Sequence, residues 1–157
     1  MNAQTIQIAP VHKTLTVKAS QKHAFEVFTD CVDAWWPRAH HLGATPPAKI
    51  IIEPRLGGRW YAKHEGGEET TNGHVLVWEP PSRVVFSWEI SPQWKESPGV
   101  GSEVEIRFIA EGSNTTRVEL MHHKFEVMGE EGGKSMRAGV EGGWTGILEL
   151  FKKEAES

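Results

Sequence analysis

The chain has 157 residues, of which 38% are hydrophobic and 24% charged, and its formal net charge at pH 7 is -4. This length fits one domain with a sizeable core, and the negative charge argues against nonspecific binding to nucleic acid or acidic membranes. No run approaches the roughly 18 apolar residues of a membrane span, so we expect neither nucleic acid nor membrane as a partner. The single cysteine, and the lack of a signal-peptide pattern in the first ten residues, favour a cytoplasmic location.

The first part of the chain predicts one strand and two short helices. Residues 12–19, HKTLTVKA, alternate apolar and polar positions as a strand does. Ser20 can cap the helix that follows, because its hydroxyl can accept from a free backbone N–H of the first turn. Residues 32–41, VDAWWPRAHH, predict a second short helix that Pro37 stops.

The middle of the chain predicts six strands, and the end predicts one long helix. The strand segments are KIIIE, GGRWYAKHE, NGHVLVWE, RVVFSWEI, SEVEIRFIAE and TTRVELMHHKFEV. Their mostly short connections favour an antiparallel meander. From about Gly133 to Glu154 the apolar residues recur at helical spacing. We therefore expect an α+β fold with a curved sheet and a covering helix, formed by residues 11–155 after a tail of residues 1–10.

The last predicted helix carries four glycines in eight residues, Gly139, Gly142, Gly143 and Gly146. Each glycine in a helix interior costs about 1 kcal/mol relative to alanine. Three of them fall close together on one face, beside the apolar face of the helix. Three interpretations stay open: tight packing of helix on sheet, a lined pocket under the helix, or a hinge that lets the helix lift.

One face of the predicted sheet is a candidate pocket wall. His122 shares strand phase with Val118 and Leu120, so its side chain is expected to point inward. An apolar pocket with one polar group is typical of a small-molecule site, whereas the alternative is a core histidine bonded to a backbone carbonyl. The candidate ligand-binding residues are Phe86, Trp88, Val104, Ile106, Phe108, Leu120, His122, Gly143 and Trp144.

Motifs for metal, nucleotide or nucleophile chemistry are missing from the sequence. There is no HxH, HExxH or CxxC spacing, so we expect no metal site. The stretch GEEGGKS, residues 129–135, is one residue too short for a phosphate-binding loop, so we expect no nucleotide cofactor. Cys31 lies beside Asp30 and Asp33, whose charges would raise the thiol pKa and weaken a thiolate nucleophile. Acid–base catalysis would rest on His122 and a nearby glutamate.

Residues 91–101, SPQWKESPGVG, form a long predicted loop between two strands. Long loops in compact domains are often lids or binding loops. Trp94 could therefore close a cavity mouth, meet a partner, or fold back on its own domain.

Several segments together resemble a known family. VKASQKHAFEVFTD, WWP, EPRLGGRWY, NGHVLVWEPPSRVVFSW, SEVEIRFIAEG, TRVELMHHKFE and GGWTGILELF occur in the order found in single-domain bacterial proteins similar to the C-terminal domain of the activator of heat-shock protein 90 ATPase. These proteins belong to the START-like, SRPBCC superfamily. The resemblance covers roughly residues 11 to 152.

The resemblance implies a helix-grip fold like that of the birch pollen allergen, with a long C-terminal helix across a seven-stranded antiparallel sheet and two short helices. Relatives commonly enclose an apolar cavity for hydrophobic molecules, and His122 matches a position that is often histidine. We therefore expect non-catalytic binding of a small hydrophobic molecule. The alternatives are a co-chaperone-like module with a chaperone as partner, and a cyclase or hydrolase that uses the same cavity.

Overall fold

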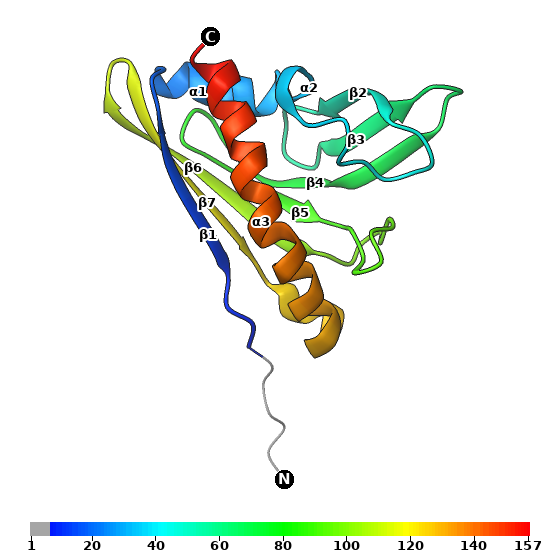
Figure 1. Ribbon diagram of the computed structural model, residues 1–157. Helices are drawn as coiled ribbons and strands as arrows, with labels where there is room; N and C mark the ends of the chain where they lie inside the picture. The colour runs from blue at the N-terminus through cyan, green and yellow to red at the C-terminus, as the bar shows by residue number, and fades with distance from the viewer. Residues whose placement is uncertain (1–6) are drawn as a thin grey trace.

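The computed structural model describes residues 7–157 and shows a curved antiparallel sheet with one long helix across it (Figure 1). The elements in chain order are β1 (Val11–Val17), α1 (Gln21–Thr29), α2 (Val32–Trp35), β2 (Pro47–Ile52), β3 (Arg59–His64), β4 (Glu69–Glu79), β5 (Arg83–Trp88), β6 (Ser102–Gly112), β7 (Thr115–His123), the 3-10 helix η1 (Phe125–Met128) and α3 (Gly129–Ala155). This order confirms the α+β helix-grip fold expected from the sequence.

The sheet is a meander that the first strand extends at one edge. Its order is β1-β7-β6-β5-β4-β3-β2, and every neighbouring pair is antiparallel. Strands β2 to β7 pair in sequence order, and the last strand, β7, also pairs with β1, where Val11 lies opposite His122. Register shifts within the β2–β3, β3–β4, β4–β5 and β6–β7 pairs introduce bulges, which increase local twist and bend the strands.

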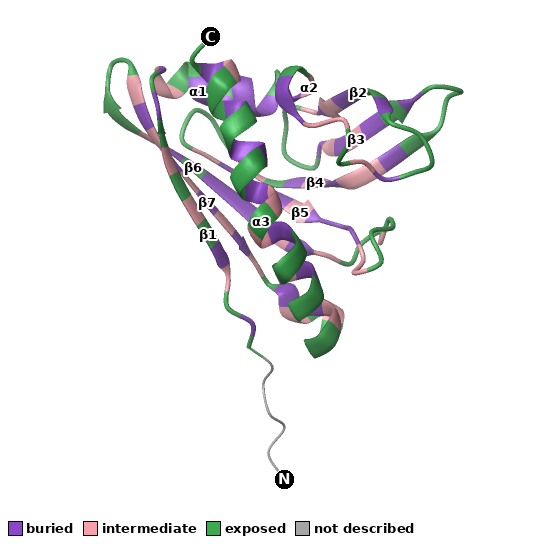
Figure 2. Ribbon diagram, viewed as in Figure 1, coloured by how far each residue is buried: buried purple, intermediate pink, exposed green. Residues whose placement is uncertain are grey.

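Helix α3 runs across the face toward which the sheet curves, and its buried stripe alternates with an exposed outer face (Figure 2). The helix begins at Gly129, one turn before the expected start near Gly133, so the stretch GEEGGKS is helical rather than a loop. Gly129 has a φ of +79°, which favours glycine, and Glu130 and Glu131 in the first turn complement the helix dipole. Within residues 7–157, no helix is both long and apolar enough to cross a membrane.

The two short helices cover one end of the sheet. Ser20 caps α1 as expected, because its hydroxyl accepts from the backbone N–H of His23 at 3.1 Å. Helix α2 is only one turn long and ends before Trp36, whose backbone is extended. A residue that precedes proline is pushed out of the helical region, so the helix stops at Pro37, as the sequence predicted. The residues after α2 are left to form an irregular segment.

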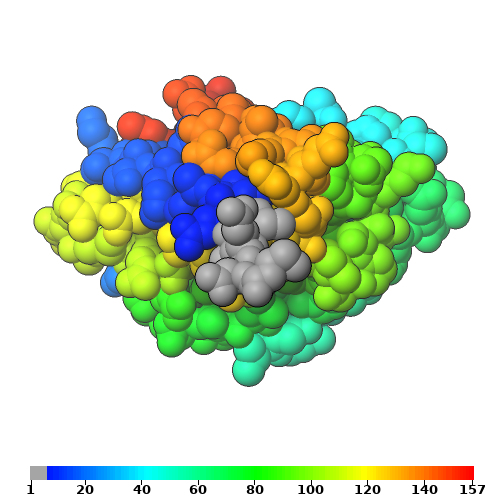
Figure 3. Space-filling view, turned by 90° about the horizontal axis from the view of Figure 1, so that it is seen from below, coloured from blue at the N-terminus to red at the C-terminus, as the bar shows by residue number. Residues whose placement is uncertain are grey.

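Residues next to the N-terminus pack against the start of α3. Of the predicted tail, residues 1–6 lie outside the described part of the chain. Ile8 is buried, and its backbone N–H donates to the Glu126 carboxylate at 2.8 Å. The Arg137 guanidinium donates to the carbonyl of Ala9 at 2.6 Å. In the view from below, this N-terminal segment lies beside the first turns of α3 (Figure 3).

Candidate functional site

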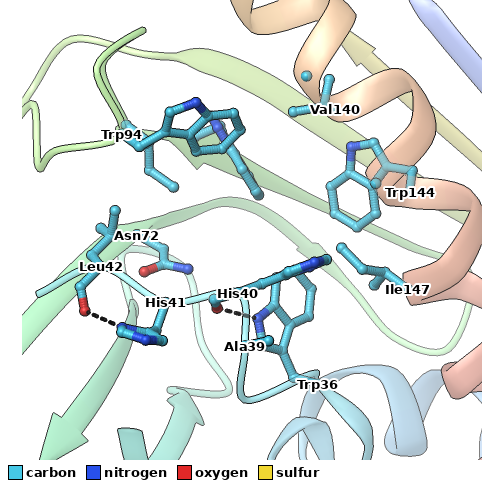
Figure 4. A pocket seen from close by; sticks show the side chains of 14 residues that line it. Trp36, Ala39, His40, His41, Leu42, Asn72, Trp94, Val140, Trp144 and Ile147 are labelled. Carbon is cyan, nitrogen blue, oxygen red and sulfur yellow. Dashed lines mark hydrogen bonds between the residues drawn. The ribbon is translucent and has the colours of Figure 1, made fainter. Parts of the chain in front are cut away.

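A hollow of about 360 Å³ opens between α3, the irregular segment after α2 and the sheet (Figure 4). Its volume falls within the roughly 300–1,000 Å³ typical of small-molecule pockets. The lining comes from the segment after α2, from β4, from β5 and the loop that follows it, and from α3. The lining residues are Trp36, Ala39, His40, His41, Leu42, Asn72, Trp88, Ile90, Trp94, Gly139, Val140, Gly143, Trp144 and Ile147.

Three buried tryptophans, Trp36, Trp88 and Trp144, form the floor of the hollow. The ring centroids of Trp36 and Trp144 are 5.9 Å apart at an interplanar angle of 79°, and those of Trp88 and Trp144 are 5.6 Å apart at 56°. These are edge-to-face and tilted contacts of the kind that stabilise aromatic clusters. The Trp36 indole N–H also donates to the backbone carbonyl of His40 at 3.3 Å (Figure 4). The floor is therefore a fixed aromatic surface.

Two of the four helix glycines border the hollow, and they serve different purposes. A Cβ atom at Gly143 would have no heavy atom within 4 Å, so this position leaves space open. A Cβ atom at Gly139 would lie 2.8 Å from Cζ2 of Trp94, so this position permits close packing. Gly142 and Gly146 face open space away from the hollow, and nothing in the structure explains glycine there.

Trp94 lies at the opening of the hollow. It is 48% exposed although it contributes to the lining, and its ring folds back onto α3 at Gly139. Its backbone φ is 60°, which is uncommon for a bulky residue. The loop of residues 91–101 thus brings a large aromatic side chain to the rim.

The loop that carries Trp94 is anchored by the buried carboxylate of Glu89. This carboxylate accepts from the Ser87 hydroxyl at 2.5 Å, from Nδ1 of His74 at 2.6 Å and from the backbone N–H of Gly99 at 2.7 Å. Burial by itself would raise the pKa of Glu89, but these three hydrogen bonds outweigh it and lower the pKa below its usual value. The charged form therefore holds the far side of the loop to the sheet.

His122 lies in the core behind the floor of the hollow and is fully buried. Its Nδ1 accepts from the Trp144 indole N–H at 3.0 Å, and its Nε2 lies 2.7 Å from the Ser102 hydroxyl oxygen. An indole nitrogen only donates, so Nδ1 is unprotonated and the proton of the neutral ring is on Nε2. Burial, and to a smaller extent the nearby His123, lower the pKa of His122 from 6.5 to about 3. The neutral imidazole of His122 thus holds the Trp144 ring in position through this hydrogen bond.

The nine residues predicted to bind a ligand fall into two groups. Trp88, Gly143 and Trp144 border the hollow. The other six lie in the buried core outside its lining: Phe86, Val104, Ile106, Phe108, Leu120 and His122. Whether any of the nine contacts a ligand stays a prediction. The alternative interpretation paired His122 with a backbone carbonyl. The two hydrogen-bond partners that the structure shows, Ser102 and Trp144, are both side chains.

The polar groups of the hollow lie on the wall opposite α3. His41 and Asn72 are on one side in Figure 4, and Val140, Trp144 and Ile147 of α3 are on the other. Sequence reasoning did not select these two polar residues, because Asn72 lies in a strand without any motif and His41 lies in a loop. The Pro37 stop was a signal that the segment after α2 is irregular and free to border a pocket.

Cys31 is exposed and lies outside the hollow. Partial burial raises the pKa of its thiol most, followed by the charges of Asp30, Glu26 and Glu154. The predicted direction is therefore confirmed. Asp33 takes no part in this shift, and its carboxylate instead accepts from Arg38 at 2.7 Å. Among residues 7–157, no three histidine, cysteine, aspartate or glutamate side chains are grouped so that they could hold a metal ion.

Comparison with protein families gives one match. The model described as "Activator of Hsp90 ATPase homolog 1-like protein" matches residues 18–156. The comparison with curated proteins gives no match.

Among solved structures, an anthrahydroquino-gamma-pyrone synthase, Txn09, is 37% identical, with a TM-score of 0.65 over 94% of this chain and 97% of that one. CalC from Micromonospora echinospora, a self-sacrificing resistance protein, is 30% identical, with a TM-score of 0.70 over 93% of both chains. The Aha1 dimer from Colwellia psychrerythraea is 18% identical, with a TM-score of 0.65 over 95% of this chain and 97% of that one. At that identity, the last similarity concerns the fold alone.

Proposed function

Because the chain belongs to the Activator of Hsp90 ATPase homolog 1-like family, we propose that it binds a small aromatic molecule in the hollow under α3 and leaves it chemically unchanged. The observation that carries the proposal is the hollow itself, whose floor is three buried tryptophans and whose rim is a fourth. Flat indole faces fit flat aromatic rings, by offset stacking or edge-to-face contact.

The makeup of α3 supports this proposal. An alanine or a larger residue at Gly143 would reduce the space and raise helix propensity by about 1 kcal/mol, yet glycine stands at the one α3 position where an added side chain would enter the hollow unopposed. The names of the similar structures also support it. One is a synthase of an anthrahydroquino-gamma-pyrone and another is a resistance protein, and both names are compatible with small-molecule binding on this fold.

The test is binding of 2-naphthol, measured by isothermal titration calorimetry on the wild-type chain and on two matched variants. Gly143→Leu places four carbon atoms in the hollow, whereas Gly146→Leu places them in open space on the same helix. We expect one molecule bound per chain, at least a tenfold loss of affinity in Gly143→Leu, which is about 1.4 kcal/mol, and wild-type affinity in Gly146→Leu. Equal affinity in both variants, or no binding to the wild type, would contradict the proposal.

Chemistry in the same hollow is the second candidate, favoured by the 37% identity to a protein named as a synthase. His122 is a poor acid–base group for it, because this residue is fully buried and its pKa is lowered to about 3. Any proton transfer would instead use His40 or His41, which border the hollow. The two candidates are separated by native and denaturing mass spectrometry of the protein purified from its own host. A bound molecule whose mass stays constant supports binding, whereas a bound molecule whose mass changes over time supports catalysis.

The family description also keeps a co-chaperone role as an alternative prediction. Its test is the ATPase rate of a heat-shock protein 90 homologue with and without this chain.

A cytoplasmic location remains a prediction from the single cysteine and the sequence of the first ten residues.

A further inference from the structure

Asn72 points into the hollow because of an irregularity in strand β4. Along this strand Val75 is buried and His74 is partly exposed, and strict alternation from them would turn residue 72 to the outer face of the sheet. The pairing with β3 shifts at this point, since Trp60 lies opposite Gly73 and Tyr61 opposite residue 71. Asn72 is therefore the extra residue of a bulge, and bulges redirect a side chain.

The backbone of this bulge is fixed, whereas the side-chain amide has no partner. The Asn72 carbonyl accepts from the backbone N–H of Glu89 at 2.7 Å. Within residues 7–157, the Asn72 carboxamide forms no hydrogen bond to any other group of the chain. It offers two donors and one acceptor to a hollow whose other walls are largely apolar. An amide in such a place is complete only when water or a ligand bonds to it.

His41 lies beside Asn72 and adds an acceptor. Both residues border the main hollow and also a smaller recess of about 10 Å³, so they are neighbours on one wall. Nδ1 of His41 lies 3.2 Å from the carbonyl oxygen of Leu42 (Figure 4). Since a carbonyl only accepts, Nδ1 carries a proton, and in the neutral ring Nε2 is then an acceptor.

From this arrangement we infer that the hollow selects aromatic molecules that carry a hydroxyl or carbonyl oxygen on the ring edge, and that Asn72 is the residue that recognises this oxygen. The inference rests on the proposed function. A ring hydroxyl accepts from the Asn72 amide and donates to its oxygen or to Nε2 of His41, while a ring carbonyl accepts from the amide. A plain hydrocarbon would displace water from the amide and leave it unpaired, which is how a polar site rejects an apolar analogue.

The test compares two probes of nearly equal shape, 2-naphthol and 2-methylnaphthalene, on the wild type and on Asn72→Leu. The dissociation constants are measured by calorimetry, and the quantity of interest is the ratio of the 2-methylnaphthalene constant to the 2-naphthol constant. Comparing this ratio between proteins cancels the different hydrophobicity of the probes, as in a double-mutant cycle. We expect the ratio to fall about three- to tenfold in Asn72→Leu, the range of one neutral hydrogen bond.

The control is Asn114→Leu, which makes the same change in an exposed turn between β6 and β7 and is expected to keep the wild-type ratio. If N72L does not fold, N72A carries the same comparison without added bulk. Binding of both probes with an unchanged ratio in the Asn72 variant would overturn the inference and leave the proposed function standing. Failure of the wild type to bind either probe would instead refute the proposed function.

Discussion

Replacing His122 with glutamine is expected to make folding stability less sensitive to acid, because the chain then takes up about one proton fewer when it unfolds at low pH. Glutamine is neutral at every pH, and it can accept from Trp144 and donate to Ser102, as the neutral imidazole does. In the wild type the pKa of His122 is about 3 in the folded chain and 6.5 in an ordinary environment. Between these values the unfolded chain binds a proton at this residue and the folded chain does not.

The sign and the size follow from this difference. The free energy of unfolding of the wild type is unaffected by His122 above pH 6.5 and falls by about 1.4 kcal/mol for each pH unit below it, until the folded chain also protonates. From pH 7 to pH 4.5 the loss due to this residue is about 2.5 kcal/mol. A folded pKa one unit higher would change this figure by only about 0.1 kcal/mol, because pH 4.5 would still lie above it.

The assay is urea unfolding followed by circular dichroism at several pH values from 7 to 4.5, on the wild type and on His122→Gln. The glutamine variant is expected to be less stable at pH 7, because imidazole fits the core better, and the gap should close by about 2.5 kcal/mol at pH 4.5. Carboxylates such as Glu89 titrate in both proteins, so their effect cancels. His23→Gln, at an exposed position of α1, controls for the loss of a histidine outside the core. A gap that stays constant with pH would show that His122 protonates in the folded chain, and would refute the buried, neutral assignment.

Two further predictions concern the loop with Trp94. Gly139→Ala places a methyl group against the Trp94 ring, so we expect acrylamide to quench tryptophan fluorescence more strongly while stability stays equal or rises. The control Gly142→Ala, which adds its methyl group in open space, should leave quenching unchanged. Glu89→Gln weakens the charge-assisted hydrogen bond to Gly99, so hydrogen exchange at the Gly99 amide should accelerate roughly tenfold. Because the pKa of Glu89 is lowered, the carboxylate stays charged below the usual carboxyl pKa, so wild-type protection should persist there and be lost only as the pH falls through the lowered pKa. Exchange at the same rate in both proteins would mean that this carboxylate does not hold the loop.

The sequence predicted the architecture well because each element carries its own local signal. Alternation predicted the first strand and turn signals separated the other six, whose mostly short connections left few ways to pair them. Phase also predicted that His122 points inward, and it is fully buried. Pro37 stops α2 as predicted, whereas α3 begins at Gly129, one turn before the predicted start near Gly133.

The candidate site was harder to predict, because pointing inward is not the same as bordering a hollow. Phe86 and Phe108 have the inward phase, but α1 covers them: Phe28 of α1 packs against both, at centroid distances of 6.5 Å and 5.9 Å. Only the region that the helices leave uncovered can receive a ligand. That region is set by packing between elements far apart in sequence, which strand periodicity does not report.

The features that create the hollow share a physical origin, since each is a local break in a regular element. Pro37 ends α2, and the irregular segment that follows forms one wall. Gly143 removes a side chain from α3 where one would fill the space, and the bulge at Asn72 turns an amide toward an apolar interior. A fold selected only for stability would gain by repairing these breaks, because helix propensity, strand pairing and satisfied amides all favour the regular alternative. Three such breaks around one aromatic cavity are the pattern expected when stability is given up for a site, and this argues for binding in the hollow more strongly than its volume does.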